Sequence, residues 1–172
     1  MLLHRGAVGV LPTDTLYGLV GSALNKDAVE RIYKLKKRDA SKPSIILIGD
    51  VKQLDLFGIS EGDKQRASEY WPGSISVILG CNEPSFTYLH RGSNALAFRL
   101  PNQQSLWKFL EESGPLIAPS ANVQSQPPST NINEAKGYFG NSVDFYMDAG
   151  SLDGKPSKLI SLLGKKPRTL RS

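Results

Sequence analysis

The side chains of this sequence that could do chemistry are small hydroxyls, amides and two groups of cations. Thr15 follows one short apolar run, and Ser120 and Asn122 follow another. Lysine and arginine gather in residues 34–42 and again in residues 155–171. Hydroxyl and amide groups can orient an anionic small molecule, and fixed cations can neutralise it. The pattern therefore predicts a site for an anionic small molecule.

Several common kinds of catalytic centre have no signature in the sequence. His4 and His90 are the only histidines, and neither stands in a recognisable pairing with a carboxylate or a cysteine. The nucleophile elbow, the P-loop and the dinucleotide-binding glycine motif are absent. Cys81 is a single cysteine with no metal-ligand spacing around it. We therefore expect neither histidine-based catalysis nor a metal ion held by protein side chains.

Length and composition predict one globular domain over residues 1–172. Hydrophobic residues make up 40% of the chain and charged residues 22%, which is ordinary for a folded protein. No apolar run reaches the roughly 18 residues of a membrane span, so we expect no membrane partner and a cytoplasmic location. The net charge of +5 suits phosphate-bearing partners, but charge alone does not separate a nucleotide-binding enzyme from an RNA-binding module.

The elements that must position these residues alternate between strands and helices. Short apolar runs predict buried strands at residues 7–11, 44–48, 75–79, 95–100, 116–118 and 143–147. Apolar residues at helical spacing predict helices from Asn25 to about residue 38, at 62–70, from 101–102 to about 113, and at 134–139. We expect a turn at 12–18, loops at 81–93 and 124–131, and a basic tail at 150–172.

This alternation predicts an α/β layer architecture. In such folds, ligands bind in the loops at the carboxyl ends of the strands. Thr15 follows the first strand, and Ser120 and Asn122 follow a later one. We therefore expect these three side chains to converge if the sheet is largely parallel.

Both a structural and a functional interpretation fit the cations inside the predicted elements. Lys36, Lys37 and Arg38 end the first helix, where the helix dipole favours each cation by about 0.3–1 kcal/mol without any ligand. The alternative is that they hold an anion. Arg99 stands in an apolar strand, where a cation is costly to bury. It either meets an internal carboxylate or points into a ligand site, and the sequence leaves both open.

Five short motifs follow one another along the chain. They are Pro12-Thr13-Asp14-Thr15-Leu16-Tyr17-Gly18-Leu19, then Lys36-Lys37-Arg38 with Lys42-Pro43, then Trp71-Pro72-Gly73, Phe98-Arg99-Leu100-Pro101 and Ala118-Pro119-Ser120-Ala121-Asn122. Their order and spacing resemble the YrdC-like family, the threonylcarbamoyl-AMP synthases, and the chain is similar to the short bacterial members. The resemblance covers about residues 7–171. It implies a single α/β domain whose twisted mixed sheet is flanked by helices, with a concave basic cleft.

The resemblance also implies a reaction. A nucleotidyltransferase of this family forms threonylcarbamoyl-AMP and pyrophosphate from L-threonine, bicarbonate and ATP. The product feeds N6-threonylcarbamoyladenosine modification of tRNA, so tRNA and tRNA-modification proteins are further expected partners. The carbamate of threonine is already an anion, and its oxygen can attack the α-phosphate without losing a proton. The protein then supplies positioning and charge neutralisation, and Mg²⁺ is expected to bind through the nucleotide phosphates.

Matching the motifs position by position implies roles for individual residues. The threonine-binding residues would be Thr15, Arg99 and Ser157. The catalytic cations, which also bind the nucleotide phosphates, would be Lys36 and Arg38. The other nucleotide contacts would be Ser120, Asn122, Thr130 and Arg171. We expect Thr15, Lys36 and Arg38 on one wall of a cleft, and Arg99, Ser120 and Asn122 on the opposite wall.

Departures from the family pattern keep other functions open. The family's Ser-Gly after the Ser-Ala-Asn motif is Gln124-Ser125 here, and Lys158 stands where a threonine is usual. Family members usually carry a helix before the first strand, and this sequence begins almost at the strand. One alternative is an RNA-binding module for tRNA or double-stranded RNA, although no aromatic residues alternate with the cations as in single-strand binders. The other is a paralogue with the same fold and a different acceptor.

Overall fold

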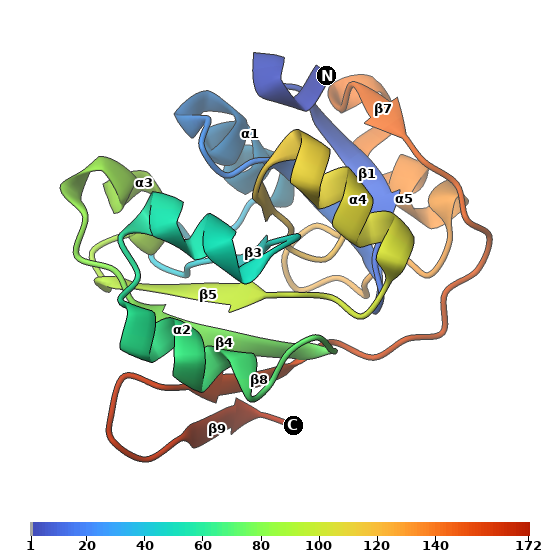
Figure 1. Cartoon of the computed structure of the whole chain (residues 1–172). Coiled ribbons are helices and arrows are strands. Elements are labelled where there is room, and N and C mark those ends of the chain that lie inside the picture. Colours follow the sequence, from blue (N-terminus) through green and yellow to red (C-terminus); the bar gives the residue numbers. More distant parts are fainter. Residues whose placement is uncertain (1) are drawn as a thin grey trace.

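One mixed sheet runs through the computed structural model, which describes residues 2–172 (Figure 1). Its nine strands are β1 (Val8–Pro12), β2 (Tyr17–Ser22), β3 (Ile45–Leu47), β4 (Ile75–Gly80), β5 (Ala95–Arg99), β6 (Leu116–Ile117), β7 (Phe145–Tyr146), β8 (Lys158–Ser161) and β9 (Arg168–Arg171). Their order across the sheet is β7-β1-β2-β6-β3-β5-β4-β8-β9. Five neighbouring pairs are antiparallel and three are parallel. The expected mixed sheet is confirmed, and the condition of a largely parallel sheet is not met.

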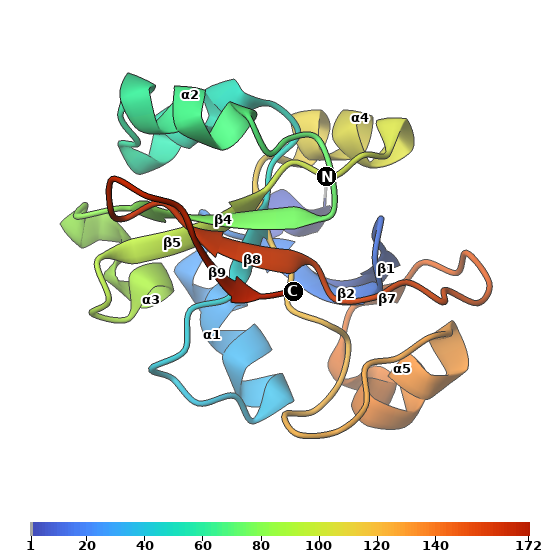
Figure 2. The ribbon, with the colours of Figure 1, turned by 90° about the horizontal axis from the view of Figure 1, so that it is seen from below.

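Helices cover both faces of this sheet. The α-helices are α1 (Lys26–Lys36), α2 (Glu61–Ser68), α3 (Thr87–His90), α4 (Gln104–Ser113) and α5 (Ile132–Phe139). The short 3₁₀ helices are η1 (Leu2–Arg5), η2 (Val51–Phe57), η3 (Pro84–Phe86) and η4 (Gly140–Ser142). Figure 2 shows α2 and α4 on one side of the strands and α1 and α5 on the other. The α/β layer architecture predicted from the sequence is therefore confirmed.

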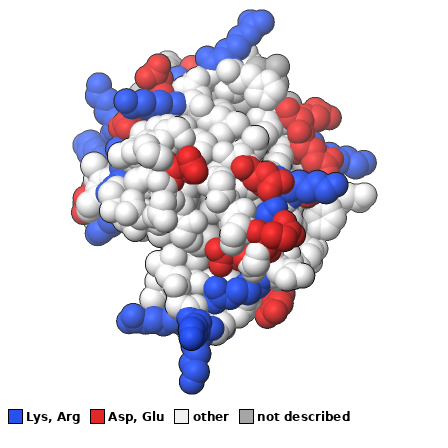
Figure 3. All heavy atoms as spheres, turned by 60° about the vertical axis from the view of Figure 1, so that its left-hand side comes forward, with Lys and Arg blue, Asp and Glu red and all other residues white. Residues whose placement is uncertain are grey.

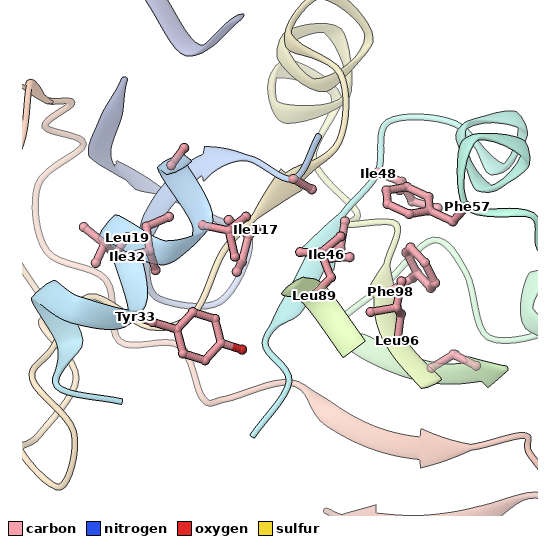
Figure 4. Close-up of a cluster of buried hydrophobic side chains, with 14 of the residues drawn as sticks. Leu19, Ile32, Tyr33, Ile46, Ile48, Phe57, Leu89, Leu96, Phe98 and Ile117 are labelled. Atoms are coloured by element: carbon pink, nitrogen blue, oxygen red, sulfur yellow. The ribbon is translucent and has the colours of Figure 1, made fainter. Parts of the chain in front are cut away.

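Side chains that alternate along the strands build the core on the two faces. Val10 and Leu19 belong to a large buried cluster with Ile32 of α1. Their strand neighbours Leu11 and Val20 point the other way, into a second cluster that includes residues of α4. Successive side chains of a strand point to opposite faces, so one apolar run supplies both clusters. Figure 4 shows Ile32 against Leu19 in the large cluster.

Both ends of α1 are fixed by capping residues. The side chain of Asn25 accepts a hydrogen bond from the backbone N–H of Ala28 at 3.0 Å, which satisfies a donor of the first turn. At the other end, Lys37 adopts a left-handed backbone with φ 50°, and its N–H closes onto Lys34 O. The chain leaves the helix there, so Lys36 is helical and Arg38 is not.

Three predictions of secondary structure are wrong. Tyr17–Ser22 is β2, a buried strand antiparallel to β1, whereas we expected a turn up to residue 18 and no strand after it. The turn itself is limited to the residues between the two strands. Within β2, Gly21 allows α1 to pack closely, since a Cβ there would lie 3.1 Å from Ile32 Cδ1 and 3.3 Å from Ala28 Cβ. The predicted loop at 81–93 contains η3 and α3, and the tail contains β8 and β9.

Candidate functional site

Two adjoining cavities lie where the β1–β2 turn, the end of β5, the segment after β6 and the tail meet. The inner cavity has a volume of about 130 Å³ and the outer one about 440 Å³. Ile45, Pro119, Ser120 and Arg171 line both. A molecule in one cavity can therefore meet a molecule in the other at this shared wall.

The β1–β2 turn gives the inner cavity its hydroxyl groups. Thr13 Oγ1 donates to Leu16 O at 2.7 Å and accepts from the N–H groups of Thr15 and Leu16 at 3.2 and 3.3 Å. It also lies 3.1 Å from Thr15 Oγ1. A side-chain oxygen that binds its own turn in this way fixes the backbone. Thr15 is thus held in the wall of the inner cavity.

Arg99 meets an internal carboxylate and also lines a cavity. It ends β5 and lines the inner cavity, and its Nη2 lies 3.1 Å from Asp14 Oδ1. Both side chains are buried, with 5% and 6% of their surface exposed. Burial lowers the pKa of the Arg99 guanidinium, the Asp14 carboxylate raises it, and nearby Arg171 lowers it. The cation is therefore paired internally and also available to a ligand.

The tail closes the inner cavity with Ser157 and Arg171. The parallel pairing of β4 with β8 brings Ser157 Oγ to 2.8 Å from Ser76 Oγ. Arg171 donates from Nε to Ser157 O at 2.9 Å and from Nη2 to Ser157 Oγ at 3.2 Å. Burial lowers the pKa of Arg171. Ser157 and Arg171 were predicted as site residues from a tail that matches the family motif less well. Both line the inner cavity.

Arg38 belongs to the outer cavity. Its Nε donates to Lys42 O at 3.1 Å and its Nη2 to Pro43 O at 3.0 Å, which holds the guanidinium along this segment. Apolar side chains also line this cavity, among them Ala95 and Ala97 of β5 and Leu159 and Leu163 of the tail. The outer cavity thus combines two arginines, Arg38 and Arg171, with an apolar lining.

Lys36 lies behind the cavity wall rather than in it. Its Nζ donates to Ser120 O at 2.5 Å, to Asn122 O at 2.6 Å and to Asn122 Oδ1 at 3.2 Å. The residue is 2% exposed and lines neither cavity. Burial, and secondarily the charge of Arg38, lower the pKa of Lys36 to about 7. The ammonium group braces the loop after β6.

Ser120 and Asn122 are hydrogen-bonded to each other, but only Ser120 lines the cavities. Ser120 Oγ donates to Asn122 Oδ1 at 2.6 Å, and Ser120 lines both cavities. Asn122 lines neither, and its Nδ2 donates to Val123 O and Gln126 O inside the loop. Of the six residues expected on two walls of one cleft, four reach the cavities: Thr15, Arg38, Arg99 and Ser120.

Thr130 lies outside both cavities. Its N–H and hydroxyl bind Glu134 Oε2 at 2.7 and 3.2 Å, at the start of α5. Its carbonyl accepts from the N–H of Leu152 at 2.7 Å, which ties down the tail. The contacts of Thr130 therefore link two segments of the chain.

The departures from the family motifs have visible local consequences. Ser125, where the family has glycine, adopts φ 69°, a left-handed backbone that favours glycine. Gln124 Oε1 accepts from the N–H of Asp39 at 2.8 Å, and Gln124 N donates to Lys36 O at 2.8 Å. Lys158 begins β8 as an exposed residue. The altered loop is thus bonded directly to the segment that carries Lys36 and Arg38.

Two residues of the site were missed as candidates. Thr13 organises the turn, and Asp14 pairs with Arg99, although both stand inside the first motif. Their types gave a signal, because Thr and Asp at a strand end cap turns and an acid can pair with a cation. Which partner each would meet depends on strand pairing that the sequence did not reveal.

Charge around the cavities comes from a few arginines. Within residues 2–172, neither Arg38 nor Arg171 has a carboxylate within 4.0 Å, whereas Arg99 has Asp14. Figure 3 shows Lys and Arg mixed with Asp and Glu on one face, with Lys and Arg gathered at its lower end. The basic cleft therefore stays a prediction.

Residues 2–172 have neither a metal-binding cluster nor a membrane-spanning helix. They contain no group of three or more His, Cys, Asp or Glu side chains that could hold a metal ion. Within the same residues, no helix has the length and apolar character needed to cross a membrane.

Comparisons with known proteins identify the family of this chain. A model of the family Sua5/YciO/YrdC, described as "Telomere recombination", matches residues 1–172. The threonylcarbamoyl-AMP synthase of Bacillus subtilis is 35% identical over 160 residues, which are 91% of this chain and 45% of that protein. The chain thus spans about half the length of that relative.

Two solved structures have a fold similar to that of this chain. The crystal structure of Pyrococcus abyssi Sua5 complexed with L-threonine superposes with a TM-score of 0.88 at 32% identity, covering 98% of this chain and 51% of that one. The crystal structure of Escherichia coli YciO superposes with a TM-score of 0.86 at 22% identity, covering 99% and 85%. At that identity, the second match supports the fold alone.

Proposed function

Because the chain belongs to the Sua5/YciO/YrdC family, we propose that it is a nucleotidyltransferase that makes threonylcarbamoyl-AMP from L-threonine, bicarbonate and ATP. Relatives named threonylcarbamoyl-AMP synthase support this reaction over an RNA-binding module or a paralogue with another acceptor. The product would be passed to proteins that modify tRNA.

The inner cavity suits threonine. Thr15 and Ser157 offer hydroxyl groups, and the Arg99 guanidinium offers a partner for the substrate carboxylate. A solved relative is described as complexed with L-threonine, which supports an amino acid in this family's site. We assign the threonine-binding role to Thr15, Arg99 and Ser157.

The outer cavity suits the nucleotide. An apolar wall that includes Ala95 and Ala97 can take a base, and Arg38 can bind phosphate oxygens in bidentate fashion. Lys36 and Asn122 would act from behind the wall by holding Ser120, with which they are in contact. Thr130 would reach the nucleotide only through the tail that it binds.

The proposal rests on the wall that the two cavities share, because the bond between the carbamate and the α-phosphorus must form where the cavities meet. Arg171 is the cation of that wall. Threonine and bicarbonate first give the carbamate and water. A carbamate oxygen then attacks the α-phosphorus of ATP, and the bond from that phosphorus to the bridging oxygen breaks, so pyrophosphate leaves. A guanidinium at this point can stabilise the charge that develops on the phosphoryl oxygens.

Mg²⁺ would be carried by the nucleotide. The described residues offer no cluster of acidic or imidazole ligands for it, and ATP phosphates are good ligands for a hard cation. When bound, it would neutralise charge on the β- and γ-phosphates. The protein's own contribution is then to hold the two substrates and the α-phosphate in line.

Pyrophosphate release tests the proposal. Purified protein with threonine, bicarbonate, ATP and Mg²⁺ should release pyrophosphate, and omission of threonine or bicarbonate should abolish the release. Arg171→Met should lower kcat/KM by about 100-fold or more. Arg168→Met, an exposed arginine in the same strand, is the matched control and should keep full activity. No release, or release that does not need threonine, would refute the proposed function.

A further inference from the structure

Asp14 stands out as a buried carboxylate next to the inner cavity that lines neither cavity itself. It lies in the β1–β2 turn between Thr13 and Thr15. Its Oδ1 is 3.1 Å from Arg99 Nη2, and its Oδ2 accepts from the N–H of Asn102 at 3.4 Å. One side chain therefore joins the turn, the end of β5 and the segment that leads to α4.

Arg99 has few other restraints. Its Nη2 donates to Thr13 Oγ1 at 3.4 Å, and its Nε has no hydrogen-bond partner. Within residues 2–172, Asp14 is its one carboxylate within 4.0 Å. A long side chain that is held by few hydrogen bonds can reorient when its strongest polar contact is removed. The position of the guanidinium thus depends mainly on Asp14.

The contacts of Asp14 leave part of Arg99 free. A guanidinium has five N–H donors, and both measured side-chain contacts use Nη2. The remaining donors can face a ligand carboxylate in the inner cavity, which Arg99 lines. Asp14 also offsets the charge of a guanidinium that is buried close to Arg171.

We propose that Asp14 is a positioning residue that orients Arg99 for the carboxylate of the amino-acid substrate. The inference rests on the proposed function, because it assigns Arg99 to that carboxylate. Asp14 acts on the inner cavity alone, so its loss should weaken amino-acid binding and leave nucleotide binding unchanged.

Asp14→Asn tests this role, because it keeps the shape and removes the charge. The KM for threonine should rise at least fivefold, while the KM for ATP changes less than twofold. Asp144→Asn is the matched control, since it removes the carboxylate of another arginine pair, with Arg31, away from both cavities. It should leave both KM values unchanged. A threonine KM that rises less than fivefold in Asp14→Asn, or an equal rise for ATP, would overturn the proposal.

A double variant separates positioning from a general structural effect. Arg99→Met alone should raise the KM for threonine, and adding Asp14→Asn to it should change that KM less than twofold. Removing both members of a buried ion pair is also milder for folding than removing one. An additional fivefold rise in the double variant would mean that Asp14 acts by another route. If Asp14→Asn does not fold, Asp14→Ser, which also removes the carboxylate, is judged by the same fivefold criterion.

Calorimetry distinguishes this inference from the proposed function. Wild-type protein that binds threonine without releasing pyrophosphate would refute the proposed reaction only. The loss of threonine affinity in Asp14→Asn would then still support the positioning role, and unchanged affinity would overturn it. Wild-type protein that binds no threonine overturns both.

Discussion

Gly154 should be essential for the inner cavity, because the tail crosses the β1–β2 turn there without room for a side chain. A Cβ on Gly154 would lie 1.8 Å from Thr15 O, 2.7 Å from Thr15 C and 3.1 Å from Thr15 Cα. These atoms are backbone, so they cannot rotate away. The substitution Gly154→Ala must push the tail and the turn apart.

The size of that displacement follows from the contact. An ordinary contact between carbon and a carbonyl oxygen is about 3.3 Å, so the two segments must separate by about 1.5 Å. Pro156 and Ser157, which come next along the tail, line the inner cavity opposite Thr15. A displacement of about 1 Å in substrate-positioning groups can cost about 100-fold in rate. We therefore expect kcat/KM for threonine to fall about 100-fold in Gly154→Ala.

The assay is pyrophosphate release at varied threonine, with thermal unfolding measured on the same samples. Gly164→Ala is the matched control in the same tail, because a Cβ there meets nothing closer than Lys166 O at 3.9 Å. It should retain wild-type kinetics. Gly154→Ala with a threonine kcat/KM within threefold of wild type would refute the reasoning, because the tail would then not shape the cavity.

Two further predictions concern stability. Burial lowers the folded-state pKa of Lys36 to about 7 from 10.5, so between these pH values the unfolded chain binds more protons and the free energy of unfolding rises with pH. Urea titrations of wild type and Lys36→Met should show this rise in the difference between them, and a flat difference would contradict it. Ser125→Gly should raise the free energy of unfolding by about 0.5–1 kcal/mol, because glycine adopts φ 69° without strain. A lower urea midpoint in that variant would contradict it.

Most of the central elements could be predicted because their patterns are strong. β1, β3, β4, β5 and β6 are apolar runs, and α1 and α4 place apolar residues on one face. β2 was missed because Gly18 and Gly21 interrupt its run, and glycine is read as a bend unless the packing is known. β9 was missed because an exposed edge strand carries little apolar pattern, and every residue of β9 is exposed. β8, its neighbour, is short and has only one fully buried residue. The residues that complete the inner cavity lie on or beside these strands.

We expected the site residues to converge, but through a different arrangement of strands. Thr15 and Ser120 were expected to meet at the carboxyl ends of parallel strands. Instead, the β1–β2 turn comes back beside β6, and Gly18 pairs with Ser120 in an antiparallel bridge. Side-chain types therefore identified the residues, while their meeting depended on long-range pairing that no local pattern encodes.

The family motif does not indicate which way the side chains of Lys36 and Arg38 point. The motif assigns both cations to the nucleotide, yet residues two apart on a helix do not share a face. Lys37 ends α1 with a left-handed backbone, which turns Arg38 toward the outer cavity and leaves Lys36 facing the loop after β6. The two cations then have separate tasks: Arg38 lines the cavity, and Lys36 fixes Ser120, which lines it. That division depends on the left-handed cap at Lys37, which ends the helix between the two cations, and on the long-range contact of Lys36 with the loop after β6.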